Sequence, residues 1–410
     1  MKPLILADIQ KTLIIPYVQR DIHQSLAEAL KSPEVLILYG PRQVGKSVEI
    51  LQLIKELLLD RLRPDIDIYY FNLDRQTLEF SDPEKFWAEI LATKNFPQGK
   101  SYIFIDEAQR FEGLGLFVKY LYDKRNDVKF VLTGSASLDI KQKIKEPLTG
   151  RKREFFLSPF SLKEILAFKG VKNFPLQENL ALFQESLEEY LLYGGYPGVV
   201  TLPGAANKKE KLQEIAKSYL FKDLSEYFSG IDAADLELAA TYLAENTGQI
   251  LSKDNLSNLT GIGKYKLEKI LRALTAGFVV DKLPSFFKNR TRELIHRPKI
   301  YFYDLGIRNA ILGKMTAVSI VSDRGKLFEN AVYLLLKNRS RKVNFWRTHN
   351  QTEVDFLTFN DEGLAEAWEA KFSADSGKPT KNLLSLQKQY PELIKSAVVV
   401  SRENIYKFLV

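Results

Sequence analysis

Between residues 35 and 160, short apolar runs alternate with longer segments in which apolar residues recur at helical spacing. The apolar runs are VLILY, IDIYYFNL, YIFID and VKFVLTG, and the helical segment SVEILQLIKELLLDRL lies between the first two. Strands that alternate with helices predict a parallel sheet covered by helices, because each parallel crossover has room for a helix. We therefore expect an α/β domain at residues 1–160.

The pattern becomes mainly helical after SPFSLKEI (158–165) and stays helical to about residue 235. The stretch YGGYPG (193–198) interrupts it, because glycine and proline break regular helices. We expect a helical lid region at residues 161–235.

The next segment combines two short helices with apolar strands. SKDNLSNLT and KYKLEKILRALTAG are helical and are joined by GIG, and apolar runs in FVVDKLPSFF and KIYFYDLG flank a basic stretch. This order predicts a helix, a turn, a second helix and a β-hairpin. The segment from residue 252 to about 304 is similar to a winged helix, and we expect that domain at residues 236–305.

The rest of the chain returns to a mixed pattern. GKLFENAVYLLLKNRS (325–340) has the spacing of an amphipathic helix. The strand-like runs NFWRTH, EVDFLTF, LAEAWEAKFS and SAVVVS follow, with the helical segment LLSLQKQYPELI before the last of them. We expect a second, smaller α/β domain at residues 306–410.

Composition narrows the class of protein. The chain of 410 residues is 45% hydrophobic and 27% charged, which is typical of a globular protein. No apolar run approaches the roughly 20 residues that span a bilayer, and the N-terminus lacks the apolar core of a signal peptide. We expect a cytoplasmic protein with no membrane partner. The lack of cysteine excludes disulfides and thiolate zinc sites, and the three histidines (His23, His296 and His349) are scattered, so we expect any metal to be held by oxygen.

Positive charge is concentrated in one region. Residues 281–350 hold 15 Lys and Arg against 5 Asp and Glu, although the whole chain carries a net charge of only +8. Such a region is typical of proteins that bind a polyanion such as nucleic acid. A solvated, lysine-rich surface is an equally good interpretation of the charge alone.

The clearest motif is GPRQVGKS, which lies between the strand VLILY and a helix. It matches the P-loop pattern, in which backbone N–H groups and a helix N-terminus face phosphate, a lysine reaches the β- and γ-phosphates, and a hydroxyl binds Mg²⁺. The predicted nucleotide-binding residues here are Gly40, Pro41, Arg42, Gln43, Val44, Gly45, Lys46 and Ser47.

Two further strands end in residues that suit ATP chemistry. SYIFIDEAQR ends in Asp106, which can hold the Mg²⁺ shell together with Ser47, and in Glu107, which can polarise the attacking water. VKFVLTGSAS ends in Thr133 and Ser135, either of which can hydrogen-bond the γ-phosphate or that water. An ordinary turn is the alternative for the second group.

LTGRKREFF offers Arg151 and Arg153 as candidates for an arginine finger, and Arg151 is the stronger one. The planar guanidinium of arginine suits this role because it contacts the charge that spreads over the transferred phosphoryl group. Basic residues that are simply solvated are the alternative.

Together, GPRQVGKS, IFIDEAQR, LTGSAS and GR followed by LSPFSLKEI resemble the AAA+ type family of archaeal and bacterial P-loop ATPases with an uncharacterised C-terminal module. YLLYGGYPG, YLFKDL, PKIYFYDLGIRNAILG and GKLFENAVY also resemble later segments of that family, so the similarity covers nearly the whole chain. The resemblance implies a P-loop fold and nucleotide chemistry, with ATP and Mg²⁺ as cofactors.

In a winged helix, the second helix and the hairpin would face a DNA duplex. The residues expected there are Lys264, Tyr265, Lys266, Lys269 and Arg272 on the helix, and Lys288, Arg290 and Arg292 on the hairpin. The alternative is a winged helix that docks protein or acts as a lid.

The C-terminal α/β segment resembles a PD-(D/E)xK nuclease core, that is, a restriction-endonuclease-like domain. Glu329, Asp355, Glu369 and Lys371 match the pattern, in which acids from a helix and two strands surround Mg²⁺ and a lysine orients water. The motif's proline is absent before Asp355, where the chain has Glu353 and Val354. A structural salt bridge, or a nuclease fold without activity, is the alternative.

The leading hypothesis is an AAA+ type protein that binds and hydrolyses ATP and whose nucleotide state controls a C-terminal half directed to DNA, with nuclease activity left open. The alternative is an ATP-dependent regulatory switch or protein-interaction module with an inactive nuclease-like domain. Its partner would be another protein or a second copy of the chain.

Overall fold

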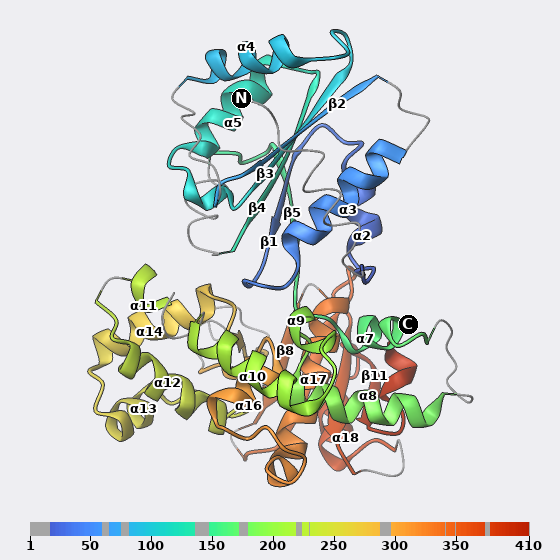
Figure 1. Ribbon diagram of the computed structural model, residues 1–410. Helices are drawn as coiled ribbons and strands as arrows, with labels where there is room; N and C mark the ends of the chain where they lie inside the picture. The colour runs from blue at the N-terminus through green and yellow to red at the C-terminus, as the bar shows by residue number, and fades with distance from the viewer. Residues whose placement is uncertain are drawn as a thin grey trace. The chain divides into compact units, whose positions relative to one another are not determined.

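The chain divides after Ser158 into two compact units, Met1–Ser158 and Pro159–Val410 (Figure 1). The first boundary lies close to the predicted one at residue 160. The predicted boundaries at 235 and 305 lie inside the second unit and stay predictions. The computed structural model describes residues 17–59, 65–74, 82–135, 147–171, 179–218, 224–228, 230–287, 297–340, 342–348, 350–373 and 378–409.

A five-stranded sheet forms the centre of the first unit, in the order β2-β3-β4-β1-β5, and its strands pair in parallel. This confirms the predicted parallel sheet. The edge strand β5 was not predicted, because its sequence KREFF begins with three charged residues. The strands are β1 (Val35–Tyr39), β2 (Ile66–Asn72), β3 (Lys100–Asp106), β4 (Val128–Gly134) and β5 (Lys152–Phe156).

Helices cover both faces of this sheet (Figure 1). On one face, Phe86 of α4 packs edge-on against Phe117 of α5, with ring centroids 5.3 Å apart, over the buried strand residue Ile103. Helix α4 begins at Pro83 because the Asp82 side chain accepts the N–H groups of the first turn. The elements are α2 (His23–Ala29), α3 (Lys46–Leu59), α4 (Pro83–Thr93), the short helix η1 (Ala108–Arg110) and α5 (Leu114–Lys124).

The second unit begins with a helical region, as predicted. Its first helix is fixed by a capping box: Ser161 accepts the Glu164 N–H at 3.2 Å, and the Glu164 carboxylate accepts the Ser161 N–H at 2.8 Å. Within the described residues, no helix has the length and apolar character needed to cross a bilayer. The helices are α7 (Leu162–Phe168), α8 (Leu180–Tyr193), α9 (Pro197–Val200), α10 (Ala205–Ile215), α11 (Leu224–Tyr227), α12 (Ala233–Glu245) and α16 (Leu305–Ile311).

A buried polar contact joins the end of α8 to the start of α16. Asp304 caps α16 and accepts the Gly195 N–H at 2.7 Å. Asn309 donates its side-chain amide to the carbonyls of Leu191 and Leu192 at 2.9 and 3.0 Å, which satisfies the last turn of α8. The motifs YLLYGGYPG and IYFYDLGIRNAILG therefore stabilise the fold of this unit.

The predicted helix, turn, helix and hairpin are confirmed. Gly261 ends the first helix in the left-handed conformation (φ 70°), and Ile250, which precedes both helices, bridges to Lys299 at the start of the last strand. The elements are α13 (Lys253–Thr260), α14 (Lys264–Ala276), β6 (Val280–Leu283) and the antiparallel β7 (Lys299–Phe302).

The C-terminal sheet has the order β11-β10-β9-β8, with β10 and β11 parallel and the other pairs antiparallel. On one face, Phe356 of β9 packs against Tyr333 of α17. The neighbouring Leu357 packs with Leu383 and Leu386 of α18, so the two helices cover opposite faces. The elements are α17 (Arg324–Arg339), β8 (Val343–Arg347), β9 (Glu353–Phe359), β10 (Ala365–Lys371), α18 (Lys381–Gln389) and β11 (Ile394–Ser401).

Candidate functional site

The P-loop connects β1 to α3 and curls through two residues with positive φ. Gln43 has φ 62° and Gly45 has φ 94°. Alternating left-handed residues turn successive N–H groups toward one concave side, which suits phosphate. The P-loop pattern predicts that Gly40 allows the loop to curl, but the structure gives a different reason for glycine at this position. A Cβ there would lie 2.1 Å from the Leu157 carbonyl oxygen. Of the other predicted residues, Pro41 and Val44 are buried, and Arg42 and Ser47 are half-buried.

Lys46 is the first residue of α3, and its side chain is almost fully buried. Its Nζ donates hydrogen bonds to the carbonyls of Gly40 and Pro41 at 3.2 and 2.8 Å. Burial lowers the pKa of Lys46 to about 8, although Glu107 and Asp106 act in the opposite direction. An anion beside Nζ would restore the full charge of the ammonium, and a phosphate is such an anion.

Asp106 ends β3 and is fully buried. Its carboxylate accepts hydrogen bonds from the hydroxyl of Thr133 at the end of β4, from the Tyr70 hydroxyl at 3.0 Å and from the Asn72 amide at 3.4 Å. Tyr70 and Asn72 lie on β2, so both strands that flank β3 hold this carboxylate in place. The sequence indicated Asp106 and Thr133 but not the two donors on β2.

Glu107 follows directly and adopts the left-handed conformation, with φ 55°. This conformation costs a non-glycine residue of order 1–3 kcal/mol and is commonly held at functional sites. The Glu107 N–H donates to Thr133 Oγ1 at 3.1 Å, and its carboxylate accepts from Gln109 and, at 3.3 Å, from Ser135. The left-handed backbone therefore places Glu107 next to Thr133 and Ser135. Gln109 was not among the predicted site residues.

Arg151 lies at the start of β5 and forms a two-point ion pair with Asp123 on α5. Its Nε is 2.6 Å from Asp123 Oδ1, and its Nη2 is 3.2 Å from Asp123 Oδ2. The hydrogen bond to Asp123 raises the pKa of Arg151. Arg153 lies over the Phe155 ring. The arginine-finger role of Arg151 stays a prediction, and it would require this ion pair to open.

Two buried side chains from the segment before β1, Arg20 and His23, contact the P-loop and the first turn of α3. Arg20 donates to the Val44 carbonyl at 3.0 Å and to the Ser158 carbonyl at 2.6 Å. His23 lies 2.6 Å from Glu49 in the first turn of α3, and its hydrogen bond to that carboxylate raises its pKa. No sequence pattern indicated these contacts.

A second polar centre lies in the second unit, where α17, β9 and β10 meet. Phe356 on β9 pairs with Trp368 on β10, and Asp355 and Glu369 are the adjacent residues on these two strands. The Ala370 N–H donates to Asp355 at 2.9 Å. Burial, and next the charge of Glu329, raise the pKa of Asp355 to about 7. Asp355 and Glu329 therefore lie within electrostatic reach of each other, and Lys371 lies within reach of Asp355, Glu369 and Glu329.

Lys371 contacts one of these acids directly, because its Nζ is 2.9 Å from Glu369 Oε1. Thr380 also donates its hydroxyl to Glu369. Among the residues that the structure describes, no group of three or more His, Cys, Asp or Glu side chains is arranged to hold a metal ion. The sequence did not indicate Lys299, whose buried ammonium lies among the acids of this centre.

The predicted DNA-contact residues on α14 lie on a surface of mixed charge. Lys264 pairs with Asp254 at 2.7 Å, and Lys266 pairs with Asp232 and Asp235. The remaining helix residues are Lys269, which lies over the exposed ring of Tyr265, and Arg272. The predicted hairpin residues Lys288, Arg290 and Arg292 lie outside the described residues.

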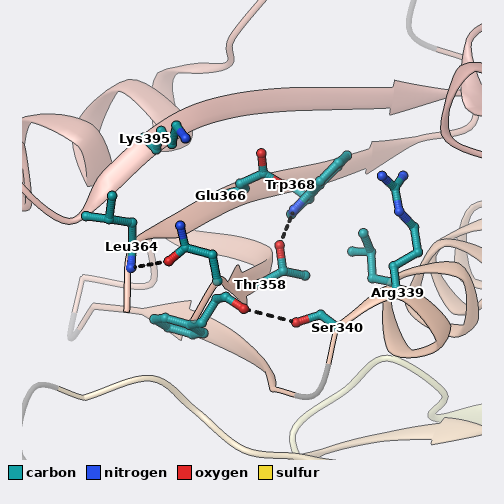
Figure 2. Close-up of a pocket in the computed structure, with 10 residues that line it drawn as sticks. Arg339, Ser340, Thr358, Leu364, Glu366, Trp368 and Lys395 are labelled. Carbon is teal, nitrogen blue, oxygen red and sulfur yellow. Dashed lines mark hydrogen bonds between the residues drawn. The ribbon is translucent and has the colours of Figure 1, made fainter. Parts of the chain in front are cut away.

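A cavity of about 290 Å³ opens beside α17, β9 and β10 (Figure 2). Trp368 donates its indole N–H to Thr358 at 2.9 Å, and the Leu364 N–H donates to Asn360 at 2.8 Å. The residues that line the cavity do not include Glu329, Asp355 or Glu369, so the cavity is distinct from the acidic centre.

Solved structures with overall similarity include a Walker-type ATPase of Pyrococcus abyssi and the ORC2 protein of Aeropyrum pernix. The first is 19% identical with a TM-score of 0.48, and the alignment covers 73% of this chain and 99% of that one. The second is 14% identical with a TM-score of 0.43, and the alignment covers 75% and 98%.

Sequence relatives extend over most of the chain. An uncharacterised protein of Methanocaldococcus jannaschii is 25% identical over 83% of this chain and 75% of its own length. An uncharacterised protein of Haemophilus influenzae is 26% identical over 90% of this chain and 91% of its own length.

Three family models match consecutive parts of the chain. Residues 184–317 and 324–409 match two domains of unknown function, DUF8612 and DUF4143. Residues 32–166 match the family described as AAA domain. The matched range includes the P-loop, Asp106, Glu107 and the strands that carry them. Residues 32–166 of this protein are therefore similar to an AAA domain, and the P-loop lies within that match.

Proposed function

We propose that the first unit binds ATP with Mg²⁺ and hydrolyses the bond between its β- and γ-phosphates. The observation that carries this proposal is the meeting of three strand ends at one edge of the sheet. The P-loop follows β1, Asp106 ends β3 and Glu107 follows it, and Thr133 lies near the end of β4 with Ser135 just after it; β4 lies between the other two strands. Ligands bind at the carboxyl ends of parallel strands in α/β sheets of this kind.

Each side chain has a role that its geometry supports. Lys46 supplies positive charge to the phosphates, and the P-loop N–H groups bind their oxygens. The oxygens of Ser47 and Asp106 are donors of the type Mg²⁺ prefers, and the ion would neutralise charge on the phosphates. Glu107 orients and polarises the attacking water, while Gln109 and Ser135 hold its carboxylate in position.

For the second unit, we propose a DNA-binding role that the nucleotide state controls. The support is the order of α12, a bridging residue, α13, α14 and the hairpin β6–β7, which is the order of a winged helix. The acidic partners of Lys264 and Lys266 mean that phosphate must compete with internal ion pairs for these lysines.

Charge reversal on α14 tests this role. We expect Lys266→Glu with Lys269→Glu to weaken duplex binding and to reduce the slope of log K against log salt by about 1 per lost phosphate contact. Lys381→Glu, at the start of α18, is the matched control and should change neither quantity. If the double variant keeps the wild-type slope, the surface binds a protein partner instead.

The C-terminal sheet has the element order of the nuclease core it resembles, a helix, three strands, a helix and a strand. Two lysines favour a domain that does not cleave DNA. Lys371 pairs with Glu369, and Lys299 pairs with both Glu353 and Glu329, so these three acids already have cationic partners within the protein.

We therefore expect no nicking of plasmid DNA by the purified protein with Mg²⁺ or Mn²⁺, with or without ATP. Asp355→Ala should change stability without changing any cleavage signal. Agarose electrophoresis of supercoiled plasmid measures this directly. Nicking by the wild type that both Asp355→Ala and Lys371→Ala abolish, with ATP turnover intact, would show an active nuclease.

A further inference from the structure

The cation at the acidic centre of the second unit is part of the chain itself. Lys299 begins β7, and its side chain is only 3% exposed. Its Nζ lies 2.6 Å from Glu353 Oε1 on β9 and 3.4 Å from Glu329 Oε1 on α17. A residue of the hairpin thus reaches into the centre that α17, β9 and β10 build.

This lysine is buried, and it has two acidic partners. Both Glu353 and Glu329 lie within 3.4 Å of its Nζ. A buried charge is costly unless it is paired. The two glutamates therefore supply the pairing that a buried ammonium ion needs.

The carboxylates around Lys299 also have other partners. Glu329 accepts the Tyr301 hydroxyl at 2.6 Å, and Glu353 lies 3.2 Å from Arg347 Nη1. A divalent ion such as Mg²⁺ needs several oxygen atoms that turn toward it together. In this structure those oxygens point to an ammonium, a guanidinium and hydroxyl groups.

We propose that the Lys299 ammonium is the resident cation of this centre, where it pairs with Glu329 and Glu353 and keeps a divalent metal ion out. The proposal deepens the proposed non-cleaving role of the second unit. In this interpretation, the ion pairs of Lys299 connect β7 of the hairpin to α17 and β9. A metal ion enters only when this ammonium is removed.

Binding of Mn²⁺ to the nucleotide-free, full-length protein tests the proposal, because it needs neither ATP turnover nor DNA. Free Mn²⁺ is measured by its electron paramagnetic resonance signal. The variants are Lys299→Met, Asp355→Asn, the double variant Lys299→Met with Asp355→Asn, and Lys282→Met. The last removes a lysine from the partner strand β6, directly opposite Ile300, and is the matched control.

We expect the wild type and Lys282→Met to show no saturable Mn²⁺ binding at this centre. Lys299→Met should gain one saturable Mn²⁺ site, with an affinity at least about tenfold above any residual binding by the wild type, because removal of one positive charge leaves the acids uncompensated. The double variant should lose that gain. Circular dichroism at the start of each titration confirms that a variant is folded.

Two results would overturn the proposal. One is a saturable Mn²⁺ site in the wild type that Asp355→Asn alone removes, and this measurement holds even if Lys299→Met does not fold. The other is a folded Lys299→Met protein that binds Mn²⁺ no better than Lys282→Met. Either result leaves the proposed ATP hydrolysis by the first unit untouched.

Discussion

Replacement of Glu107 by Gln should leave ATP bound and reduce its turnover by about 10²–10⁴-fold, the usual contribution of a positioned general base. The amide keeps the shape of the carboxylate, so the left-handed backbone and the contact with Ser135 should persist. It removes the negative charge that polarises water. Steady-state phosphate release and equilibrium binding of a fluorescent ATP analogue measure the two effects separately.

The matched control is Glu89→Gln on α4, which removes an acid of the same unit at an exposed position. Its turnover should equal that of the wild type. A Glu107→Gln protein with normal turnover would exclude Glu107 as the residue that activates water, and loss of ATP binding in this variant would assign it a binding role instead.

Gly306→Ala should strongly destabilise the second unit. A Cβ at Gly306 would lie 2.1 Å from the Tyr193 carbonyl oxygen and 2.9 Å from Leu212 Cδ2. Overpacking of a core costs about 1–3 kcal/mol, and a clash with fixed backbone lies at the upper end of that range. Asp304 and Asn309 hold the same two helices in register, so α16 has little freedom to move away.

Thermal unfolding followed by calorimetry measures this cost, and we expect the melting temperature to fall by roughly 2–4 °C for each kcal/mol lost. Gly325→Ala on α17 is the control, because no heavy atom lies within 4 Å of the added Cβ. Equal melting temperatures for the two variants would contradict the close packing of α8 against α16.

The sequence predicted those features whose residues are neighbours along the chain. The P-loop and the acids at the end of β3 are continuous motifs next to apolar strands, so their spacing alone defines the nucleotide site. The same holds for the two helices joined by GIG and for the elements of the C-terminal sheet. In each case one local pattern contains all the information.

Contacts between distant segments left no such pattern. Arg20 supports the P-loop across 24 positions, and Lys299 meets acids 30 and 54 positions away, so neither sequence neighbourhood shows the partner. The positive charge of residues 281–350 is a second example, because the sequence does not show which of these cations pair with acids. Among the described residues, several of its cations pair with carboxylates within the protein: Lys299, Arg308, Lys314, Lys337 and Arg347. Net charge therefore overstates the positive surface that remains for a polyanion.

The most direct test of ATP hydrolysis at the P-loop is a phosphate-release assay with ATP in the presence of Mg²⁺. The assay compares the purified wild-type protein with the Lys46→Ala variant. The buried ammonium of Lys46 lies within the P-loop and has no substitute among the predicted phosphate-binding side chains except the half-buried Arg42. We predict steady phosphate release by the wild type, and loss of both tight nucleotide binding and turnover in the variant. Equal phosphate release by the two proteins would contradict ATP hydrolysis at this P-loop.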